Sequence, residues 1–297
     1  MKKIFLMLFV LVGVSGCTQL DFNIPSSSAL ENDKNFVASD DKIISHYIDV
    51  GQGDASLIEL SNGEVMLIDA GIASSSQKII EYIKSLGYDR IDYVIATHPH
   101  ADHIGGMAEV IKAFDIGTIY MPKAVSTSKT YENLLETIKE KGLHVKTGKA
   151  GVSVLQDENL TIDMLAPNQD KYSSLNNYSI VLKITYGNTS FLYTGDAEEL
   201  SEKEITGDVK ADVLKVGHHG SDSSSSDEFL KRVNPKYAII SVGKDNSYDH
   251  PSSSTIHKLE KYTNYIYRTD LNVTITKNTD MVLFSSFSSL LSLCKHI

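Results

Sequence analysis

Cysteine is nearly absent from this chain: Cys17 and Cys294 are the two cysteines among 297 residues. Two cysteines at opposite ends of the chain exclude a disulfide framework of the kind that holds small secreted domains together. They also exclude a structural zinc site built from several cysteines, since such sites need clustered Cys and His ligands. A metal site in this protein would therefore use histidine and carboxylate ligands.

Dense runs of Lys or Arg are also missing, and the formal net charge is -10. An acidic surface repels the phosphate backbone of nucleic acids unless a basic patch is set aside for it. Charge therefore gives no support to nonspecific nucleic-acid binding. Hydrophobic residues make up 41% of the chain and charged residues 22%, which leaves enough apolar side chains for an ordinary globular core.

Long apolar stretches are confined to the amino terminus, and none later in the chain is long enough to span a membrane. A basic start precedes an apolar run over residues 4–14, which has the length of a signal-peptide core. Small residues then lead into Cys17 in a pattern that resembles the lipobox of bacterial lipoproteins. The resemblance implies a signal peptide over residues 1–16 and a lipid on Cys17. That lipid anchor alone would hold the protein at the extracytoplasmic face of the cell membrane. An ordinary signal peptide with a chance cysteine is the alternative.

Residues 18–42 are rich in Ser, Asn and Asp, which is typical of a flexible tether after the lipidated Cys17. From residue 43 apolar runs and amphipathic stretches alternate, and helices are expected over 77–86, 104–114, 131–141, 227–233 and 252–262. Antiparallel runs of strands, together with strands that alternate with helices, predict an α/β fold with two central sheets and helices on both outer faces. We expect one domain over residues 43–280 and assign no structure to the apolar, Ser-rich tail over 281–297.

The densest group of possible metal ligands is the segment 97–103, Thr-His-Pro-His-Ala-Asp-His, which follows a short apolar strand. It contains His98, His100, Asp102 and His103. Imidazole nitrogen and carboxylate oxygen are ligands that Zn²⁺ and similar divalent ions prefer. Without a cation, four such groups in so short a segment would repel one another or stay unpaired. The segment therefore predicts a metal site, and a solvated His-rich loop is the alternative.

This HxHxDH spacing resembles the signature of the metallo-β-lactamase superfamily. Other motifs follow in the family's order: GQGDA at 51–55, IDAG at 68–71, TGDAE at 194–198, GHHGS at 217–221 and DHP at 249–251. Together they are similar to the hydrolase domain of the competence DNA-uptake channel family (ComEC) and its stand-alone relatives. The resemblance covers about residues 43–276, without the channel. It implies the metallo-β-lactamase fold, a four-layer αββα sandwich.

The resemblance also implies one or two zinc ions, with manganese as the other metal considered. His98 and His100 would hold the first ion, and Asp102 and His103 the second. Asp196, in a Gly-Asp turn after an apolar strand, would bridge the two ions.

One of His218 and His219 would complete the second site, and the sequence alone does not choose between them. Asp69 would brace the metal loop rather than bind the metal. His250 would bind substrate or donate a proton, with a structural loop role as the alternative. His46 and His257 are interpreted as surface or strand residues.

One ligand of the superfamily is missing. A further histidine for the first ion usually stands between HxHxDH and the bridging aspartate. His144 is the histidine in that interval here, and it lies before a predicted strand. The expected place holds Asn-Asn-Tyr-Ser at 176–179 instead. The first site is therefore expected to be weaker, or completed by water.

A divalent ion lowers the pKa of bound water to about 7, which makes a hydroxide nucleophile available at neutral pH. The resemblance thus implies a metal-dependent hydrolase with Asp102 and His250 as catalytic residues. Its substrates would be phosphodiesters, either nucleic acid or phosphocholine and teichoic-acid type esters. Net charge does not support nucleic acid. A lactone or β-lactam hydrolase and a noncatalytic surface-binding lipoprotein are the alternatives.

Overall fold

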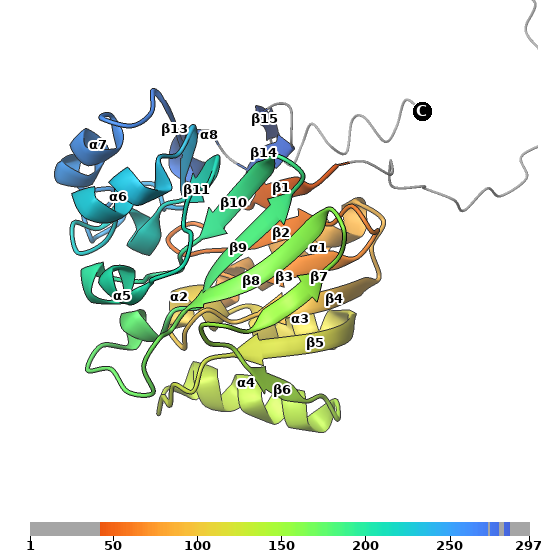
Figure 1. Ribbon diagram of the computed structural model, residues 1–297. Helices are drawn as coiled ribbons and strands as arrows, with labels where there is room; N and C mark the ends of the chain where they lie inside the picture. Colours follow the sequence, from red (N-terminus) through yellow and green to blue (C-terminus); the bar gives the residue numbers. More distant parts are fainter. Residues whose placement is uncertain (1–41, 273, 279–281, 286–297) are drawn as a thin grey trace, which may run out of the picture. The chain divides into compact units, whose positions relative to one another are not determined.

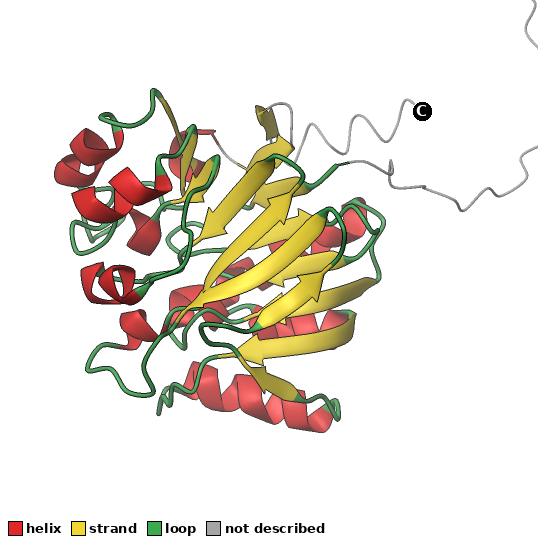
Figure 2. Ribbon diagram, viewed as in Figure 1, coloured by secondary structure: helices red, strands yellow, loops and turns green. Residues whose placement is uncertain are grey.

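The computed structural model describes residues 42–272, 274–278 and 282–285. Two β-sheets lie face to face in the middle, and helices cover their outer faces (Figure 1, Figure 2). This arrangement confirms the αββα sandwich. The expected signal peptide, Cys17, the expected tether up to residue 41 and Cys294 lie outside the described residues. Among the residues that are described, no helix has the length and hydropathy needed to cross a membrane.

The first sheet has eight strands in the spatial order β15-β14-β1-β2-β3-β4-β5-β6. In chain order they are β1 (Ile44–Tyr47), β2 (Ser56–Glu59), β3 (Val65–Ile68), β4 (Arg90–Ile95), β5 (Asp115–Met121), β6 (Val145–Thr147), β14 (Thr274–Asn278) and β15 (Val282–Ser285).

The second sheet has seven strands in the order β13-β12-β11-β10-β9-β8-β7. They are β7 (Ser153–Gln156), β8 (Leu160–Ala166), β9 (Val181–Tyr186), β10 (Thr189–Tyr193), β11 (Val213–Lys215), β12 (Tyr237–Ile240) and β13 (Tyr265–Arg268).

The α-helices are α1 (Ser76–Ser85), α2 (Ala101–Ile104), α3 (Met107–Ala113), α4 (Lys129–Glu140), α5 (Glu199–Glu204), α6 (Asp227–Val233), α7 (Ser253–Leu259) and α8 (Thr269–Asn272). Short 3₁₀ turns are η1 (Ala73–Ser75), η2 (Leu175–Tyr178) and η3 (Gly217–Gly220). The serine-rich run before α6 supplies that helix with its N-cap, because the Ser226 hydroxyl accepts a hydrogen bond from the Phe229 amide.

Three apolar layers separate the four structural layers. Strand β3 shows how one strand serves two of them, since successive side chains point to opposite faces. Met66 and Ile68 pack between the two sheets, whereas Val65 and Leu67 pack under α1 and α3. Both faces of the central strands are buried, and for this reason they read in the sequence as continuous apolar runs.

The helix expected over 104–114 is wrong as a single element, because α2 ends at Ile104 and α3 begins at Met107. Gly105 and Gly106 lie between them, against the backbone of the 70–73 segment. A Cβ atom on Gly106 would stand 2.4 Å from the Ala70 carbonyl oxygen. The break therefore brings the metal loop close to the end of β3.

The first sheet extends past residue 280, where we expected the domain to end. Strand β15 pairs antiparallel with β14, which in turn pairs with β1. Strand β7 was missed as well. It is a short edge strand without buried residues, so it carries no apolar alternation for a sequence to show.

Parallel strands bring the motifs to one edge of the sandwich. β3, β4 and β5 run parallel in the first sheet, and β10, β11, β12 and β13 run parallel in the second. Ligands of open α/β sheets usually bind outside the carboxyl ends of such strands. The segments that follow these ends are Asp69, 97–103, 194–198, 217–221 and 243–251.

Candidate metal centre

Six of the predicted ligands come together at this edge. They form two groups with Asp196 in common: Asp102, His103, Asp196 and His219 in one, and His98, His100 and Asp196 in the other. Within each group the possible ligand atoms lie within 4.8 Å of one another. We call these the second and the first ligand group, after the ions they were expected to hold.

Asp196 is fixed by its turn as well as by its side chain. It follows Gly195, whose φ of +50° lies in the left-handed region. Its amide donates to the Ser179 hydroxyl at 3.0 Å, which ties the end of β10 to the start of β9. The Thr194 hydroxyl donates to the Lys215 carbonyl at 2.8 Å. The turn is thus held from both neighbouring strands, and the Asp196 carboxylate is buried at the centre of the cluster.

In the second ligand group the possible ligand atoms face one another. His103 Nε2 lies 3.2 Å from Asp196 Oδ1, and His219 Nε2 lies 3.3 Å from Asp102 Oδ2. His103 Nε2, Asp196 Oδ1 and His219 Nε2 are buried and have no hydrogen-bond partner among the described residues. Buried polar atoms are normally satisfied. A divalent cation bound by nitrogen and oxygen would satisfy all three, so this donor set fits the implied metal.

The tautomers of these two imidazoles follow from their other partners. His103 Nδ1 lies 2.7 Å from Asp69 Oδ2, and His219 Nδ1 lies 3.0 Å from the Ser241 carbonyl oxygen. An ionised carboxylate and a carbonyl only accept hydrogen bonds, so Nδ1 donates in both rings. When the ring is neutral, each Nε2 then presents its lone pair to the cluster, as a metal-binding histidine requires.

The first ligand group is backed by hydroxyls. His98 Nε2 lies 3.0 Å from His100 Nδ1 and 3.8 Å from Asp196 Oδ2. His98 Nδ1 lies 3.1 Å from the Thr97 hydroxyl, which donates its proton to Asp69 at 2.7 Å. Because that proton is used, the Thr97 oxygen accepts from His98. Asp69 therefore braces His103 directly and His98 through Thr97, and does so from behind the ligands, as expected.

The segment 176–179 supplies scaffold rather than a ligand. The side-chain amides of Asn176 and Asn177 donate to Glu198 at 3.1 and 2.8 Å. The Asn177 oxygen accepts from the Glu198 and Ser201 amides at the start of α5. His144 is exposed between α4 and β6 and belongs to neither ligand group. The described residues thus add no further histidine from this interval to the first group.

His218 and His219 occupy different places. Both have left-handed backbone angles, with φ of 48° and 53°, which non-glycine residues seldom adopt outside functional sites. His219 is buried and belongs to the second ligand group. His218 is part-exposed, with Nε2 3.7 Å from Asp196 Oδ2 and Nδ1 3.1 Å from the Ser223 hydroxyl. The geometry therefore selects His219 for the second group and places His218 beside it.

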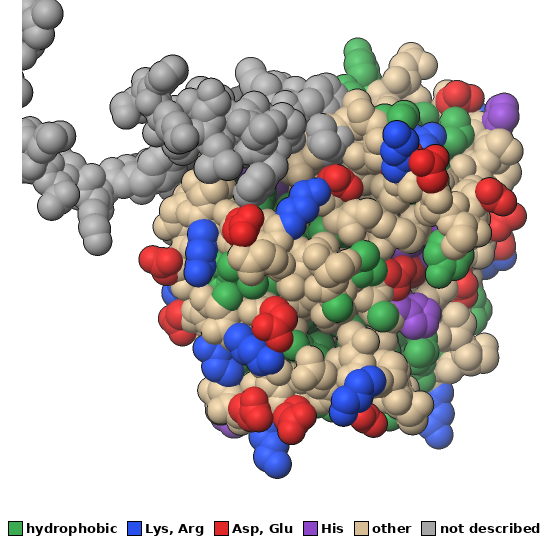
Figure 3. All heavy atoms as spheres, turned by 180° about the vertical axis from the view of Figure 1, so that it is seen from behind, with side chains coloured by type: hydrophobic (Ala, Val, Ile, Leu, Met, Phe, Trp, Pro, Cys, Tyr) green, Lys and Arg blue, Asp and Glu red, His purple; other side chains and the backbone are tan. Residues whose placement is uncertain are grey.

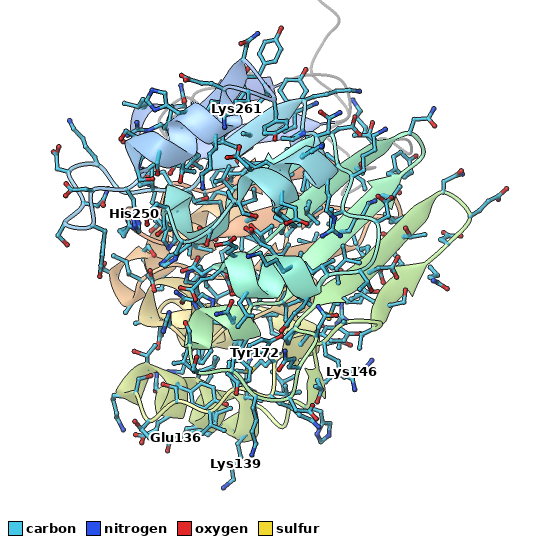
Figure 4. The ribbon with its side chains drawn as sticks, turned by 60° about the vertical axis from the view of Figure 1, so that its left-hand side comes forward. Glu136, Lys139, Lys146, Tyr172, His250 and Lys261 are labelled. Atoms are coloured by element: carbon cyan, nitrogen blue, oxygen red, sulfur yellow. The ribbon has the colours of Figure 1, made fainter. Side chains whose placement is uncertain are left out.

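An open cleft of about 340 Å³ leads to the cluster. Its walls are Gln52, His100, Ala101, Asp102, Asp196, His218, His219, Tyr248 and His250. His250, labelled in Figure 4, comes from the loop after β12, which Asn246 ties together by bonds to the Gly243 and His250 carbonyls. The exposed ring of Tyr248 stacks on His250 at 5.7 Å. The ring centroid of His250 lies 5.5 Å from that of His218 and 6.4 Å from that of His219, so His250 lies beside the second ligand group.

The pKa values of the histidines differ between the two ligand groups. Burial holds the pKa of His98 well below its usual value, and the charge of His103 adds to this. Burial also lowers the pKa of His100. For His219 burial acts in the same direction, but the carboxylates of Asp196 and Asp54 outweigh it and raise the pKa to about 9. For His103 burial is likewise outweighed, here by the carboxylates of Asp196 and Asp69, which raise its pKa well above the usual value. Without a metal, the first group is therefore neutral imidazole and the second is protonated.

The sequence reading missed two residues of this region. Asp54 and Lys215 are buried side chains that form an ion pair next to His219. Asp54 stands inside the motif at 51–55 and Lys215 stands two residues before the motif at 217–221, but the motifs themselves predict no role for either residue. The signal was a lysine in the apolar run Val213-Leu214-Lys215-Val216, where an unpaired charge would be costly.

His46 and His257 lie away from the cluster. His46 is on β1, as a strand residue, but it is buried rather than on the surface. Its ring nitrogens lie 2.7 Å from Glu59 Oε1 and 2.9 Å from the Tyr82 hydroxyl. His257 is exposed on α7. Neither belongs to a ligand group among the described residues.

Comparison with known proteins adds a family to this geometry. The family model described as the metallo-beta-lactamase superfamily matches residues 48–244. ComE operon protein 3 of Bacillus subtilis is 34% identical over 77% of this chain and 32% of its own length. Competence protein ComA of Neisseria gonorrhoeae is 28% identical over 75% of this chain and 30% of its own. This chain thus spans about a third of the length of these relatives.

Among solved structures, CmlA, a diiron beta-hydroxylase from Streptomyces venezuelae, superposes with a TM-score of 0.52. It is 14% identical and covers 81% of this chain and 54% of its own. Similarity at this level of identity shows a shared fold. It does not show which reaction the fold carries out.

Proposed function

This chain belongs to the metallo-β-lactamase superfamily of metal-dependent hydrolases, and we propose that it hydrolyses phosphodiester bonds on the extracytoplasmic side of the cell membrane. The observation that carries the proposal is the pair of ligand groups that share Asp196 at the base of an open cleft. Two divalent ions so placed would lower the pKa of coordinated water and neutralise the charge on a phosphoryl group.

The composition of the cleft favours a metal-dependent reaction on an anionic ester. No Lys or Arg occurs among the described residues that line it. A phosphodiester carries a negative charge that a productive site must neutralise. Since the walls offer no permanent cation, the ligand groups are the place where this charge would be met. Asp102, whose side chain is 32% exposed, is the carboxylate of the second group that lies open to the cleft.

His250 is proposed to bind the substrate and to handle a proton. Its ring lines the cleft beside the second ligand group, and its Nδ1 is buried without a partner among the described residues. Burial and the neighbouring His218 lower its pKa, so the ring is neutral at pH 7. A neutral imidazole offers one N–H donor and one acceptor nitrogen. His250 can thus donate a hydrogen bond to an ester oxygen and accept a proton at its other nitrogen.

Two substrate classes are proposed: nucleic acid, and esters of the phosphocholine or teichoic-acid type. One relative, of Neisseria gonorrhoeae, is named a competence protein, which supports the first. A net charge of -10 weighs against it. The face seen in Figure 3 has acidic and basic side chains interspersed, without a basic patch that would guide a polyanion.

The membrane location rests on the lipobox-like sequence that ends at Cys17. A Cys17→Ser variant is expected to lose incorporation of radiolabelled fatty acid and to leave the membrane fraction. If the variant stays in the membrane fraction and remains labelled to the same extent, the lipid anchor is wrong.

The enzymatic test uses the purified chain, stripped of metal and reloaded with Zn²⁺ or Mn²⁺. Bis(p-nitrophenyl) phosphate, a phosphocholine ester, DNA and a chromogenic β-lactam would be assayed in parallel. We expect turnover of at least one phosphodiester and none of the β-lactam. Asp102→Ala should abolish it, whereas Asp157→Ala, an exposed aspartate in the turn between β7 and β8, should not. Metal-loaded protein without phosphodiester turnover would refute the proposed activity.

A further inference from the structure

Lys215 is a buried cation next to the metal centre that the proposed chemistry does not use. It is the last residue of β11, between the parallel strands β10 and β12, and it is 2% exposed. Its ammonium group contacts Asp54 Oδ2 and donates to the Val216 carbonyl at 3.0 Å. Burying an ammonium is unfavourable unless it is closely paired. A lysine at this position therefore requires a partner that makes use of its charge.

Asp54, the partner, reaches the second ligand group through both its backbone and its side chain. Its amide donates to the Asp102 carbonyl at 3.1 Å. Asp54 Oδ1 lies 3.2 Å from His219 Nδ1, and Oδ2 lies 4.0 Å from His103 Nδ1. The His219 ring N–H donates to the Ser241 carbonyl, and the Asp54 carboxylate lies beside it as a negative charge. Asp54 contacts three ligand residues from the side that faces away from the cleft.

The Lys215 ammonium also neutralises one member of a third group of possible ligands. Asp54, Asp69 and His103 lie close enough together to hold a metal ion of their own. With Lys215 paired with Asp54, one carboxylate of that group already has a cation that belongs to the protein. Free divalent ions are then left with the Nε2 side, where Asp102 and Asp196 lie.

Asp69 and Asp54 back the two imidazoles by different means. Asp69 accepts from the Thr97 amide and hydroxyl, at 2.8 and 2.7 Å, so neutral donors hold it in place. Asp54 is held by a full positive charge. A carboxylate behind a metal-binding histidine orients the ring and makes it a better ligand. Lys215 allows a second such carboxylate in a cluster that already contains Asp69, Asp102 and Asp196.

We propose that Lys215 is a positioning residue of the metal centre: its ammonium neutralises Asp54, and the pair holds His219 so that Nε2 faces Asp102 and Asp196. The proposal rests on the metal centre of the proposed function and does not depend on the substrate. It concerns the second ligand group, since neither residue contacts His98 or His100 in the contacts described above.

The test measures binding of Mn²⁺ to the metal-free full-length chain, by electron paramagnetic resonance of the free ion. Lys215→Met keeps the length of the side chain and removes its charge. We expect Lys215→Met to lower the affinity for one of the two Mn²⁺ ions by about 10- to 100-fold, as loss of a residue behind a ligand does. The affinity for the other ion should stay within about threefold of the wild-type value. Lys215→Arg, which keeps the charge, should restore part of the loss. Lys183→Met is the matched control, since Lys183 is a strand lysine on β9 paired with Asp208.

Lys215→Met leaves a buried carboxylate without its partner, which destabilises the fold. The double variant Lys215→Met with Asp54→Asn removes both charges. We expect the double variant to fold and to show the same loss of affinity for one Mn²⁺ ion. Wild-type affinity for both ions in either folded variant would overturn the proposal. Failure of the double variant to fold would also overturn it, because the pair would then support the fold rather than the metal centre. No substrate is used, so the result is independent of the phosphodiesterase assay.

Discussion

The two ligand groups that share Asp196 differ in their carboxylate ligands and in the partners that hold their imidazoles. The second group adds the Asp102 carboxylate to two imidazoles, and Asp69 and the Ser241 carbonyl fix the tautomers of those imidazoles. The first group adds no carboxylate of its own. His98 is backed by hydroxyls, and no third histidine joins it among the described residues. Anionic ligands and fixed tautomers favour metal binding. The second group should therefore bind its ion more tightly.

The largest expected effect comes from the residue that both groups share. Asp196→Ala should remove both ions, because it takes a ligand atom from each group. Since a bound ion contributes several kcal/mol to transition-state stabilisation, turnover should fall by about 1,000-fold or more. Metal content by atomic emission and turnover on the active phosphodiester check this. Retention of one ion at wild-type affinity would show that Asp196 does not serve both groups.

The next comparison separates the adjacent histidines. His219→Ala should lower the affinity for the second ion by about 100-fold or more, since it removes a ligand. His218→Ala is the matched control and should leave that ion nearly unchanged. Titration with Mn²⁺ measures both. The reverse ranking would mean that the assignment of His219 to the second group is wrong.

The two groups should also differ in their response to pH. In the metal-free protein the pKa of His219 is about 9, because the carboxylates of Asp196 and Asp54 outweigh the effect of burial. A metal must displace that proton, so affinity for the second ion should rise about tenfold per pH unit for each proton displaced between about pH 6 and 9. The pKa of His98 is lowered, so affinity for the first ion should hardly change. Equal slopes for both ions would contradict this difference.

The same raised pKa makes a prediction for the stability of the metal-free protein. A pKa of about 9 lies above the ordinary value of 6.5, so the proton on His219 stabilises the fold fully below pH 6.5. That contribution is lost as the pH rises through about 9. The Tm of the metal-free chain should therefore fall over this range, whereas the metal-loaded chain, in which the proton is absent, should not follow it.

A smaller effect is expected from Thr97, which connects Asp69 to His98. Thr97→Val keeps the shape of the side chain and removes the hydroxyl that accepts from His98. The affinity for the first ion should fall by about tenfold, since the orientation of His98 is then less restricted. His144→Ala, at an exposed position, should leave the affinities for both ions unchanged. Loss of the first ion in that control would mean that His144 is a ligand after all.

The sequence was informative where chemistry depends on short local patterns. The HxHxDH motif is a short segment directly after one strand, so its side chains lie close together. The ligand groups contain all four of its His and Asp residues. The layers of the fold followed from alternating strands and helices. Edge strand β7 and the break between α2 and α3 did not, because they depend on contacts with distant segments.

The choice between His218 and His219 shows the same limit. Both stand in one motif, and only the left-handed turn at η3 decides which ring is buried with Asp102 and Asp196. The Asp54–Lys215 pair is still harder to predict from the sequence, because its residues are 161 positions apart and belong to segments of two different sheets. A buried lysine in a strand raised the question, and the tertiary structure was needed to identify its partner.

The most direct test of unequal ligand groups is to crystallise the metal-free chain with one equivalent of Zn²⁺ and record anomalous diffraction at the zinc edge. The structure predicts one strong peak among Asp102, His103, Asp196 and His219, and a second peak near His98 and His100 only when more zinc is added. A single peak at His98 and His100, or two equal half-occupied peaks, would contradict the account.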